Sequence, residues 1–515
     1  MPHLDRRAFL GLTGAAGVGV TAAIAGFSSA PAWADPSFAD YPFTLGVASG
    51  DPQPDGVVLW TRLAPDPLAV DGLGGMPPKV VPVNWQVAED EHFRVVVRAG
   101  AEQATPELGH SVHAEVTGLR PDREYYYRFR VGNQLSPVGR TRTAPAYDAD
   151  RRQLAFAFVS CQNLPTGHFT PYRHLAEENL DLVLHLGDYI YEGPSAGSIG
   201  RAHLPATEIF SLSDYRIRHA QYKTDPDLQL AHARFPWAVT WDDHEVENNY
   251  ADGTSEDPAQ SPESFAQRRA VAYQVYYEHM PLRRMSIPRG PDMRLYRRLR
   301  YGNLADFNIL DGRQYRSDQV PTGMDDPSRT MLGTDQEQWL LDGLSTSTAR
   351  WKVLGNQTVI THADRDPGPG QQLPNDNWNG YPAARQRLFD GVVDRGVENM
   401  VVVTGDAHCS MVSDLKQNFD DQSSRTVGVE FLGTSITSGG NGSDLDARGR
   451  EWLASNPHMK FYNARRGYVR CQLDHQQFRT EYRVVPYVTE PGAPVSTRAA
   501  FVVEAGQPGV RTDTV

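Results

Sequence analysis

Five strand-like apolar runs in this chain each end in residues of the types that commonly bind metal ions or phosphate groups. Buried strands of a parallel sheet appear in a sequence as continuous Val, Ile and Leu runs, and α/β proteins build their sites at the ends of such strands. The mixture of thiol, phenol, carboxylate, imidazole and amide indicates a metal centre and differs from the Ser, His and Asp set of a hydrolase triad. The runs are LAFAFVS before Cys161, LDLVLHLG before Asp188 and Tyr191, FPWAVTW before Asp242, Asp243, His244 and Asn248, WKVLG before Asn356 and Gln357, and ENMVVVTG before Asp406 and His408.

The length of 515 residues is too great for one hydrophobic core, so the chain is expected to form two domains. Hydrophobic residues make up 40% of the composition, which is enough to bury real cores. The formal net charge is −13 and the sequence has no basic stripe, which argues against nucleic acid as a specific partner. An anionic small-molecule substrate is not excluded, because a bound metal dominates the local charge.

The first 34 residues have the pattern of a twin-arginine signal peptide. Arg6 and Arg7 precede a Gly- and Ala-rich stretch, and Ala32-Trp33-Ala34 has the small-x-small form of a cleavage site. A disordered or anchored tail is the alternative. We therefore expect export, so that the mature chain is extracellular or periplasmic. No later run is long and apolar enough to span a bilayer, so we expect a mature chain without a transmembrane segment, and we expect it to be a monomer.

The patterning divides the chain into a β-sandwich over 40–145 and an α/β domain over 152–505. Tyr125, Tyr127 and Phe129 alternate with charged residues, and the region before Tyr125 resembles the tyrosine corner of fibronectin type III-like sandwiches. From Leu154 onward, apolar strands alternate with helical segments, which is typical of a layered α/β domain. Thr334 is a plausible cap for the helix in TDQEQWLLDGL. Residues 364–381 are rich in Pro, Gly and Asn and are expected to form a long loop near the site.

The residue types favour a site with more than one cation. Asp188 can bridge two cations through its two carboxylate oxygens. Cys161 is our choice of thiol ligand among the three cysteines, and a buried core thiol is the alternative. Tyr191 suits ferric iron, because only a strongly Lewis-acidic metal favours a phenolate at neutral pH. A buried, hydrogen-bonded aromatic is the alternative for Tyr191 taken alone.

The remaining motifs supply further ligands and a proton donor. Asp243 and His244 are neighbours that can serve as metal ligand and proton donor, and Asn248 adds an oxygen that suits calcium. A negatively charged helix start is the alternative for this motif. Asp406 and His408, two residues apart, can point into one pocket from an extended segment. Arg313 either binds an anion through its planar guanidinium or is a structural surface arginine. Together these residues are consistent with hydrolysis of phosphoesters at a two-metal site.

The motifs FVSCQN, HLGDYIYEG, WDDHEVENNY, WKVLGNQ and TGDAHCS, in this order, resemble the alkaline phosphatase D (PhoD-like) branch of the calcineurin-like metallophosphoesterases. The chain is also similar to purple acid phosphatases in Asp188-x-x-Tyr191, but it has Cys161 where they use a carboxylate and DDHE where they have Asn-His-Glu. These departures favour the PhoD-like resemblance.

The resemblance implies an N-terminal β-sandwich, similar to fibronectin III or immunoglobulin domains, followed by a four-layer α/β/β/α metallophosphoesterase domain. It also implies Fe³⁺ and Ca²⁺ as cofactors, with Asp188 bridging them. His244 falls where the superfamily keeps a His near the leaving group. Asn356, at a matching strand end, is placed with Arg313 among the substrate-binding candidates. The implied iron ligands are Cys161, Asp188, Tyr191, Asp406 and His408, and the further calcium ligands are Asp243 and Asn248.

The implied activity is hydrolysis of phosphodiesters, phosphomonoesters or both by metal-activated in-line attack. The substrate is expected to be a phosphoester small molecule, a phospholipid or a cell-wall polymer. One alternative is a phospholipase D-type hydrolase of lipid headgroups on the same scaffold. Another is a secreted, non-catalytic binding protein that uses its β-sandwich. An oxygenase is disfavoured, because the sequence lacks a set of two His and one carboxylate.

Overall fold

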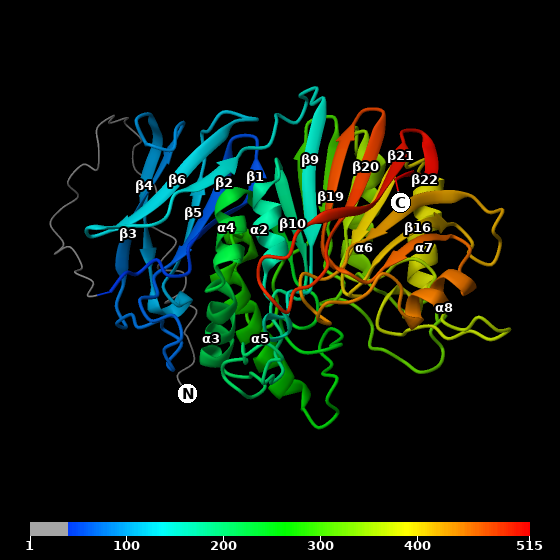
Figure 1. Cartoon of the computed structure of the whole chain (residues 1–515), viewed down its shortest axis with the longest axis horizontal. Coiled ribbons are helices and arrows are strands. Elements are labelled where there is room, and N and C mark those ends of the chain that lie inside the picture. Colours follow the sequence, from blue (N-terminus) through cyan, green and yellow to red (C-terminus); the bar gives the residue numbers. More distant parts are fainter. Residues whose placement is uncertain (1–39, 515) are drawn as a thin grey trace. The chain divides into compact units, whose positions relative to one another are not determined.

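The computed structural model describes residues 40–514 of the chain. The predicted signal peptide, residues 1–34, lies outside the described residues. Within residues 40–514, no helix combines the length and the apolar character needed to cross a membrane. This part of the chain contains three β-sheets and seven α-helices, whose arrangement is drawn in Figure 1.

Six of the first eight strands contribute residues to one hydrophobic core, in agreement with the expected β-sandwich. Along β6 (Glu124–Val131), every second residue from Tyr125 onward is buried, as a period of two requires. The backbone N–H of Arg120 donates to the Tyr125 hydroxyl over 3.0 Å, which is the contact of a tyrosine corner. The other strands of this region are β1 (Val47–Gln53), β2 (Gly56–Arg62), β3 (Val81–Ala88), β4 (Val96–Ala104), β5 (Ser111–Val116), β7 (Gln134–Leu135) and β8 (Gly139–Arg142).

Two large β-sheets pack face to face in the rest of the described chain. Alternation along β9 (Gln153–Val159) fits this layering: Phe156 and Phe158 enter the core between the sheets, and Ala157 and Val159 enter the core on the outer face. The further strands are β10 (Leu182–Leu186), β11 (Pro236–Thr240), β12 (Arg297–Tyr301), β13 (Ala305–Ile309), β14 (Trp351–Gly355), β15 (Met400–Thr404), β16 (Ser410–Lys416), β17 (Thr426–Leu432), β18 (Met459–Asn463), β19 (Arg466–Asp474), β20 (Gln477–Val485), β21 (Ser496–Glu504) and β22 (Gln507–Thr514).

One sheet of the sandwich continues directly into a sheet of the α/β domain. The ten-stranded sheet has the order β22-β21-β20-β19-β9-β10-β11-β1-β2-β5, with β1 parallel to β11. Gly50 of β1 permits this contact, because a Cβ there would lie 2.5 Å from the Pro281 carbonyl oxygen and 2.7 Å from that of Trp237. The second large sheet has the order β12-β13-β14-β15-β17-β16-β18. The boundaries 40–145 and 152–505 remain a prediction, and hydrogen bonding within the ten-stranded sheet crosses them.

Helices cover the outer face of each large sheet, which gives the layer order α/β/β/α. The prediction that Thr334 caps its helix is wrong. That helix begins at Gly333, whose N–H donates to the Thr330 hydroxyl over 2.9 Å, so Thr334 lies inside it. On the ten-stranded sheet lie α2 (Thr170–Glu177), α3 (Leu212–Lys223), α4 (Pro226–Arg234) and α5 (Pro262–His279), on the other lie α6 (Gly333–Thr346) and α7 (Pro382–Asp394), and α8 (Ala447–Ser455) contacts β18.

The five motifs lie at the carboxyl ends of parallel strands, as the sequence predicts. Three of these strands, β9, β10 and β11, are neighbours in the ten-stranded sheet. The other two, β14 and β15, are neighbours in the second sheet. The fold therefore brings residues that are far apart in the sequence to one edge of the two stacked sheets.

Candidate metal centre

Four predicted ligands have backbone conformations that are rare for residues with side chains. The angle φ is +58° at Cys161, +56° at Asp188, +64° at Asp406 and +54° at His408. Such a conformation costs on the order of 1 to 3 kcal/mol per residue, and it persists where function requires it. The two strand-end turns hold each other, since the N–H of Cys161 donates to the carbonyl of Gly187 over 3.0 Å.

The first group of side chains contains a thiol, a carboxylate and an imidazole. The ligand atoms of Cys161, Asp188 and His408 all lie within 4.8 Å of one another. The Tyr191 hydroxyl joins them, at 2.9 Å from Oδ2 of Asp188 and 3.2 Å from Nε2 of His408. Burial and nearby Arg466 lower the pKa of His408 to about 3, so its imidazole is neutral and able to bind a metal. Four of the five expected iron ligands therefore meet at one point.

The second group consists of Asp188, Asp243 and His244, whose ligand atoms also lie within 4.8 Å of one another. Asp188 is common to both groups, as a bridging carboxylate requires. Three buried carboxylate oxygens at this edge of the sheets accept no hydrogen bond from any described residue: Oδ1 of Asp188, Oδ2 of Asp242 and Oδ1 of Asp243. Buried oxygens without donors are costly, and a cation between Asp188 and Asp243 would satisfy two of them. The donor set and the free oxygens therefore fit metal ions.

The electrostatics of this edge indicate an excess of negative charge. Burial, with the charge of neighbouring acids, raises the pKa of Asp188 to about 7 and that of Asp242 to about 8. Burial also raises the pKa of Asp406 and of the Cys161 thiol well above their usual ranges. Asp243 differs: burial opposes its ionisation, but Arg313 and His244 hold its pKa below the usual value. Bound cations would reverse the shifts of the other groups, because a coordinated carboxylate or thiol is ionised.

His244 is held by a carboxylate that we did not single out in the sequence. Its Nδ1 lies 2.7 Å from Oε2 of buried Glu192, and its ring lies 4.3 Å from that of Tyr191. Burial lowers the pKa of His244, but Glu192, Asp243 and Asp188 outweigh it and raise this pKa well above the usual value. These carboxylates favour the protonated imidazole, which is the form able to donate a proton.

Two further residues that the sequence interpretation passed over support the centre. The Glu245 carboxylate accepts the N–H groups of Asp188 over 3.2 Å, Tyr189 over 2.6 Å and Asp242 over 2.9 Å, and so ties two strand-end turns together. Ser438 follows β17, a sixth apolar run, and its hydroxyl lies 2.6 Å from the Tyr191 oxygen. Glu192 lies within the motif HLGDYIYEG and Glu245 within WDDHEVENNY. The sequence signal for Ser438 is the apolar run that precedes TSITSGG.

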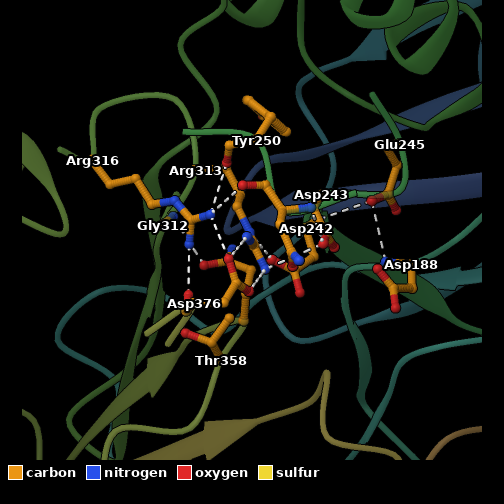
Figure 2. A network of polar contacts seen from close by, with 12 residues as sticks. Asp188, Asp242, Asp243, Glu245, Tyr250, Gly312, Arg313, Arg316, Thr358 and Asp376 are labelled. Atoms are coloured by element: carbon orange, nitrogen blue, oxygen red, sulfur yellow. Dashed lines mark hydrogen bonds and ion pairs between the residues drawn. The ribbon is translucent and has the colours of Figure 1, made fainter. Parts of the chain in front are cut away.

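The structure places Arg313 and Asn356 among buried protein partners, and their roles in substrate binding remain predictions. Arg313 is fully buried, and its guanidinium contacts the carboxylates of Asp242 and Asp376 (Figure 2). Asn356 is also buried, donates to the Thr358 carbonyl and accepts from the Trp378 indole. The turns at the strand ends place both polar groups in the protein interior, where they form hydrogen bonds or ion pairs with other protein groups.

The structure does not place the two remaining predicted ligands in the groups. The carboxylate of Asp406 belongs to neither group of mutually close ligand atoms, although it interacts electrostatically with Asp242 and Asp243. The side-chain amide of Asn248 donates to Glu256 over 2.5 Å. Their roles as iron and calcium ligands remain predictions.

Comparisons with known proteins agree with this fold. The protein-family model described as PhoD-like phosphatase matches residues 156–482. The family model described as PhoD-like phosphatase, N-terminal domain, matches residues 28–145. The chain is 54% identical over 492 residues to alkaline phosphatase D of Bacillus subtilis (strain 168), covering 93% of this chain and 83% of that protein. It is similar to a solved structure of PhoD with a TM-score of 0.90 and 54% identity, covering 93% of each chain.

The fold, the clustered ligands and these matches define a metal-dependent phosphoesterase. Within that class, the chain belongs to the PhoD-like phosphatase family. The sequence-based predictions of the family, of the fold class and of a phosphatase activity are thus confirmed.

Proposed function

We propose that the protein is an exported phosphatase that hydrolyses phosphoesters at a centre of ferric iron and calcium. One observation carries this proposal: Asp188 belongs to both groups of ligand atoms, with sulfur and phenol oxygen on one side and a second carboxylate on the other. Thiolate and phenolate favour a strongly Lewis-acidic metal such as Fe³⁺. Carboxylate oxygens favour Ca²⁺. Asp406 completes the proposed iron ligands, and Asn248 those of calcium.

The cations, when bound, would neutralise charge on the phosphoryl group and activate water for in-line attack. The side chains around them orient and protonate the substrate. Glu192 engages Nδ1 of His244 and leaves Nε2 to face a bound substrate, and the imidazole side chain is 21% exposed. His244 would therefore donate its proton to the leaving-group oxygen. The neighbouring Tyr191 ring restricts the rotation of His244.

The test joins metal analysis to a substrate panel on one purified sample of the full chain. We expect iron and calcium in the protein, a visible charge-transfer band, and hydrolysis of p-nitrophenyl phosphate or bis(p-nitrophenyl) phosphate. A colourless, iron-free and active protein would contradict the iron assignment. Activity that is indifferent to calcium chelation would contradict the calcium assignment. Hydrolysis confined to phospholipid headgroups would support the phospholipase D-type alternative.

Export is the second part of the proposal and has its own test. Arg6 and Arg7 carry the twin-arginine pattern. A double Arg6→Lys, Arg7→Lys variant should retain the protein inside the cell, because that route recognises the arginine pair. Fractionation of producing cells measures the distribution of wild type and variant. Equal export of both would contradict the twin-arginine route.

Replacing Glu192 by Gln should move the alkaline limb of the pH–activity profile to lower pH. Glu192 is the largest favourable contributor to the raised pKa of His244. Without the negative charge of Glu192, the imidazolium of His244 loses its proton at lower pH, so general-acid catalysis is lost at lower pH. The profile of kcat against pH is the measurement. An unchanged alkaline limb with reduced kcat would show that Glu192 acts only on structure.

Replacing Ser438 by Ala should accelerate loss of the thiolate-side metal to a chelator by about 10-fold or more, as for other partners of metal ligands. The hydroxyl contacts the Tyr191 oxygen over 2.6 Å and the Cys161 carbonyl over 2.8 Å, so it holds two candidate ligands together. Ser438→Thr should restore retention. Ser413→Ala, which removes a buried hydroxyl bonded to Thr361, is the matched control. Equal release from the Ser438 and Ser413 variants would refute the role.

A further inference from the structure

Asp376, in the loop formed by residues 364–381, is bound by three side chains at once. The guanidinium of Arg313 donates to both of its oxygens, over 2.9 and 3.0 Å. Arg316 donates to Oδ1 over 2.7 Å and Gln319 to the same atom over 2.8 Å. A bidentate arginine contact with a carboxylate fixes direction as well as distance. Asp376 is therefore one anchor of the loop, beside others such as the Trp378 indole, which donates to Asn356. Figure 2 shows Asp376 with Arg313 and Arg316.

The same donors reach the segment that carries Asp243. Nε of Arg313 donates to Asp242 over 2.5 Å, and its NH2 group lies 3.6 Å from Oδ2 of Asp243. Arg316 and Gln319 donate to the carbonyl of Asn249 over 2.9 and 2.6 Å. Figure 2 shows Arg313 between Asp376 on one side and Asp242 and Asp243 on the other.

These contacts leave the two oxygens of Asp243 in different situations. Oδ2 accepts the N–H of Asn249 over 2.8 Å and faces Arg313. Oδ1 is buried and accepts no hydrogen bond from any residue of the described part of the chain. Since a ligand atom of Asp243 lies within 4.8 Å of those of Asp188 and His244, the oxygen without a partner is the one available to a cation.

We propose that Asp376 is a positioning residue: it fixes Arg313 and the Asn249 backbone, which orient Asp243 toward a cation shared with Asp188, and it thereby couples that cation to the loop 364–381. This inference rests on the proposed function for the presence of the cation. It gives Arg313 a role other than the predicted substrate binding.

Charge explains the expected direction of the effect. Arg313 lies between three acids, Asp242, Asp243 and Asp376. If Asp376 loses its charge, the guanidinium is held by fewer anions and interacts more strongly with Asp243. It then competes with the cation for that carboxylate, because both are positive and close. The cation is bound more weakly, and the loop loses one of its anchors.

The experiment compares wild type and Asp376→Asn in the full chain, stripped of calcium by a chelator and titrated with Ca²⁺. Isothermal titration calorimetry gives the dissociation constant. Hydrogen exchange of peptides from 364–381, with and without Ca²⁺, reports the loop. We expect a dissociation constant at least about 10-fold higher in the variant. We also expect Ca²⁺ to slow exchange in the wild-type loop and to have little effect on it in the variant.

Glu278→Gln is the matched control, because Glu278 forms a buried two-point pair with Arg216 on α3, over 2.7 and 2.8 Å, away from the centre. It should lower the melting temperature while leaving Ca²⁺ binding unchanged. Gln319→Ala removes one donor to Asp376 and should shift binding less, in the same direction. If Asp376→Asn does not fold, the Ca²⁺ dissociation constant of Gln319→Ala tests the positioning role by itself.

The outcomes separate this inference from the proposed function. The positioning role is wrong if wild type and Asp376→Asn bind Ca²⁺ equally well. It is also wrong if Ca²⁺ does not change the hydrogen-exchange rate of residues 364–381 in wild type. Neither result contradicts the proposed function. If wild type binds Mn²⁺ or Zn²⁺ but not Ca²⁺, the calcium assignment is wrong. The dissociation constants of wild type and Asp376→Asn for the ion that binds then test the role of Asp376. If wild type binds none of these cations, both proposals fail.

Discussion

Asp188→Asn should reduce phosphatase activity by about 10³-fold or more while the chain still folds. Asp188 is shared by both groups of ligand atoms, so its loss weakens both sides of the centre together. Removing charge stabilisation from a preorganised site commonly costs about 10²- to 10³-fold for a single donor, and a bridging ligand serves two cations. Asn tolerates the left-handed backbone at this position better than most residues.

The stability of the metal-free variant gives a second readout. Burial and neighbouring acids raise the pKa of Asp188 to about 7, so without cations its charge is unfavourable. The metal-free Asn variant should therefore melt at the same or a higher temperature than metal-free wild type. Asp306→Asn changes another buried carboxylate, at the start of β13, and should keep activity. Activity of Asp188→Asn within about 10-fold of wild type would exclude the bridging role.

Acidification from pH 7 to pH 5 should destabilise the metal-loaded protein strongly. Burial lowers the pKa of several histidines in the folded chain, so these imidazoles stay neutral at pH 5, whereas the unfolded chain binds protons below about pH 6.5. Each such group then weakens folding by about 2 kcal/mol at pH 5. The pKa is lowered to about 4 at His110, His113, His203 and His458 and to about 3 at His185.

The sign follows from proton counts. A depressed histidine pKa gives stability that is present above pH 6.5 and is lost as pH falls toward 4. His244 and several buried acids oppose this trend, because burial raises the pKa of Glu430 to about 7, that of Asp242 to about 8 and that of Glu245 well above its usual range. The lowered histidines are more numerous, since burial also lowers the pKa of His219, His232 and His279 well below the usual value. Melting temperatures measured from pH 8 to pH 5 at saturating metal test the prediction. His113→Gln should reduce the loss, and a melting temperature independent of pH would contradict the argument.

The sequence predicted the positions of strands and candidate ligands because buried parallel strands leave a continuous apolar pattern. That pattern placed Cys161, Asp188 and His408 at strand ends, and the topology then brought them together. The alternation along β6 predicted the sandwich in the same way. In both cases, local periodicity carries the information, and the pairing of strands follows from the fold class.

The partners of the ligands could not be predicted, because they depend on turns from different strands meeting in space. Arg313 had two interpretations in the sequence, an anion-binding arginine or a structural surface arginine, and only the fold reveals that it is buried beside Asp376 and does not lie at the surface. Glu192 and Glu245 are ordinary acids in the sequence, and their roles depend on backbone N–H groups and an imidazole that the turns present. The Asn248 side chain turned toward Glu256, which spacing alone does not reveal.

The pairing of β1 with β11 affects how this chain can be shortened. A truncated chain starting near residue 152 would lack β1, β2 and β5 and would leave β11 as a bare edge in the middle of what is now a ten-stranded sheet. Unpaired edges recruit other chains, so such a truncation should be recovered as insoluble aggregate. The N-terminal segment thus acts as an integral part of the catalytic scaffold, and exchanging it between relatives would require matching the strand interface as well as the linker.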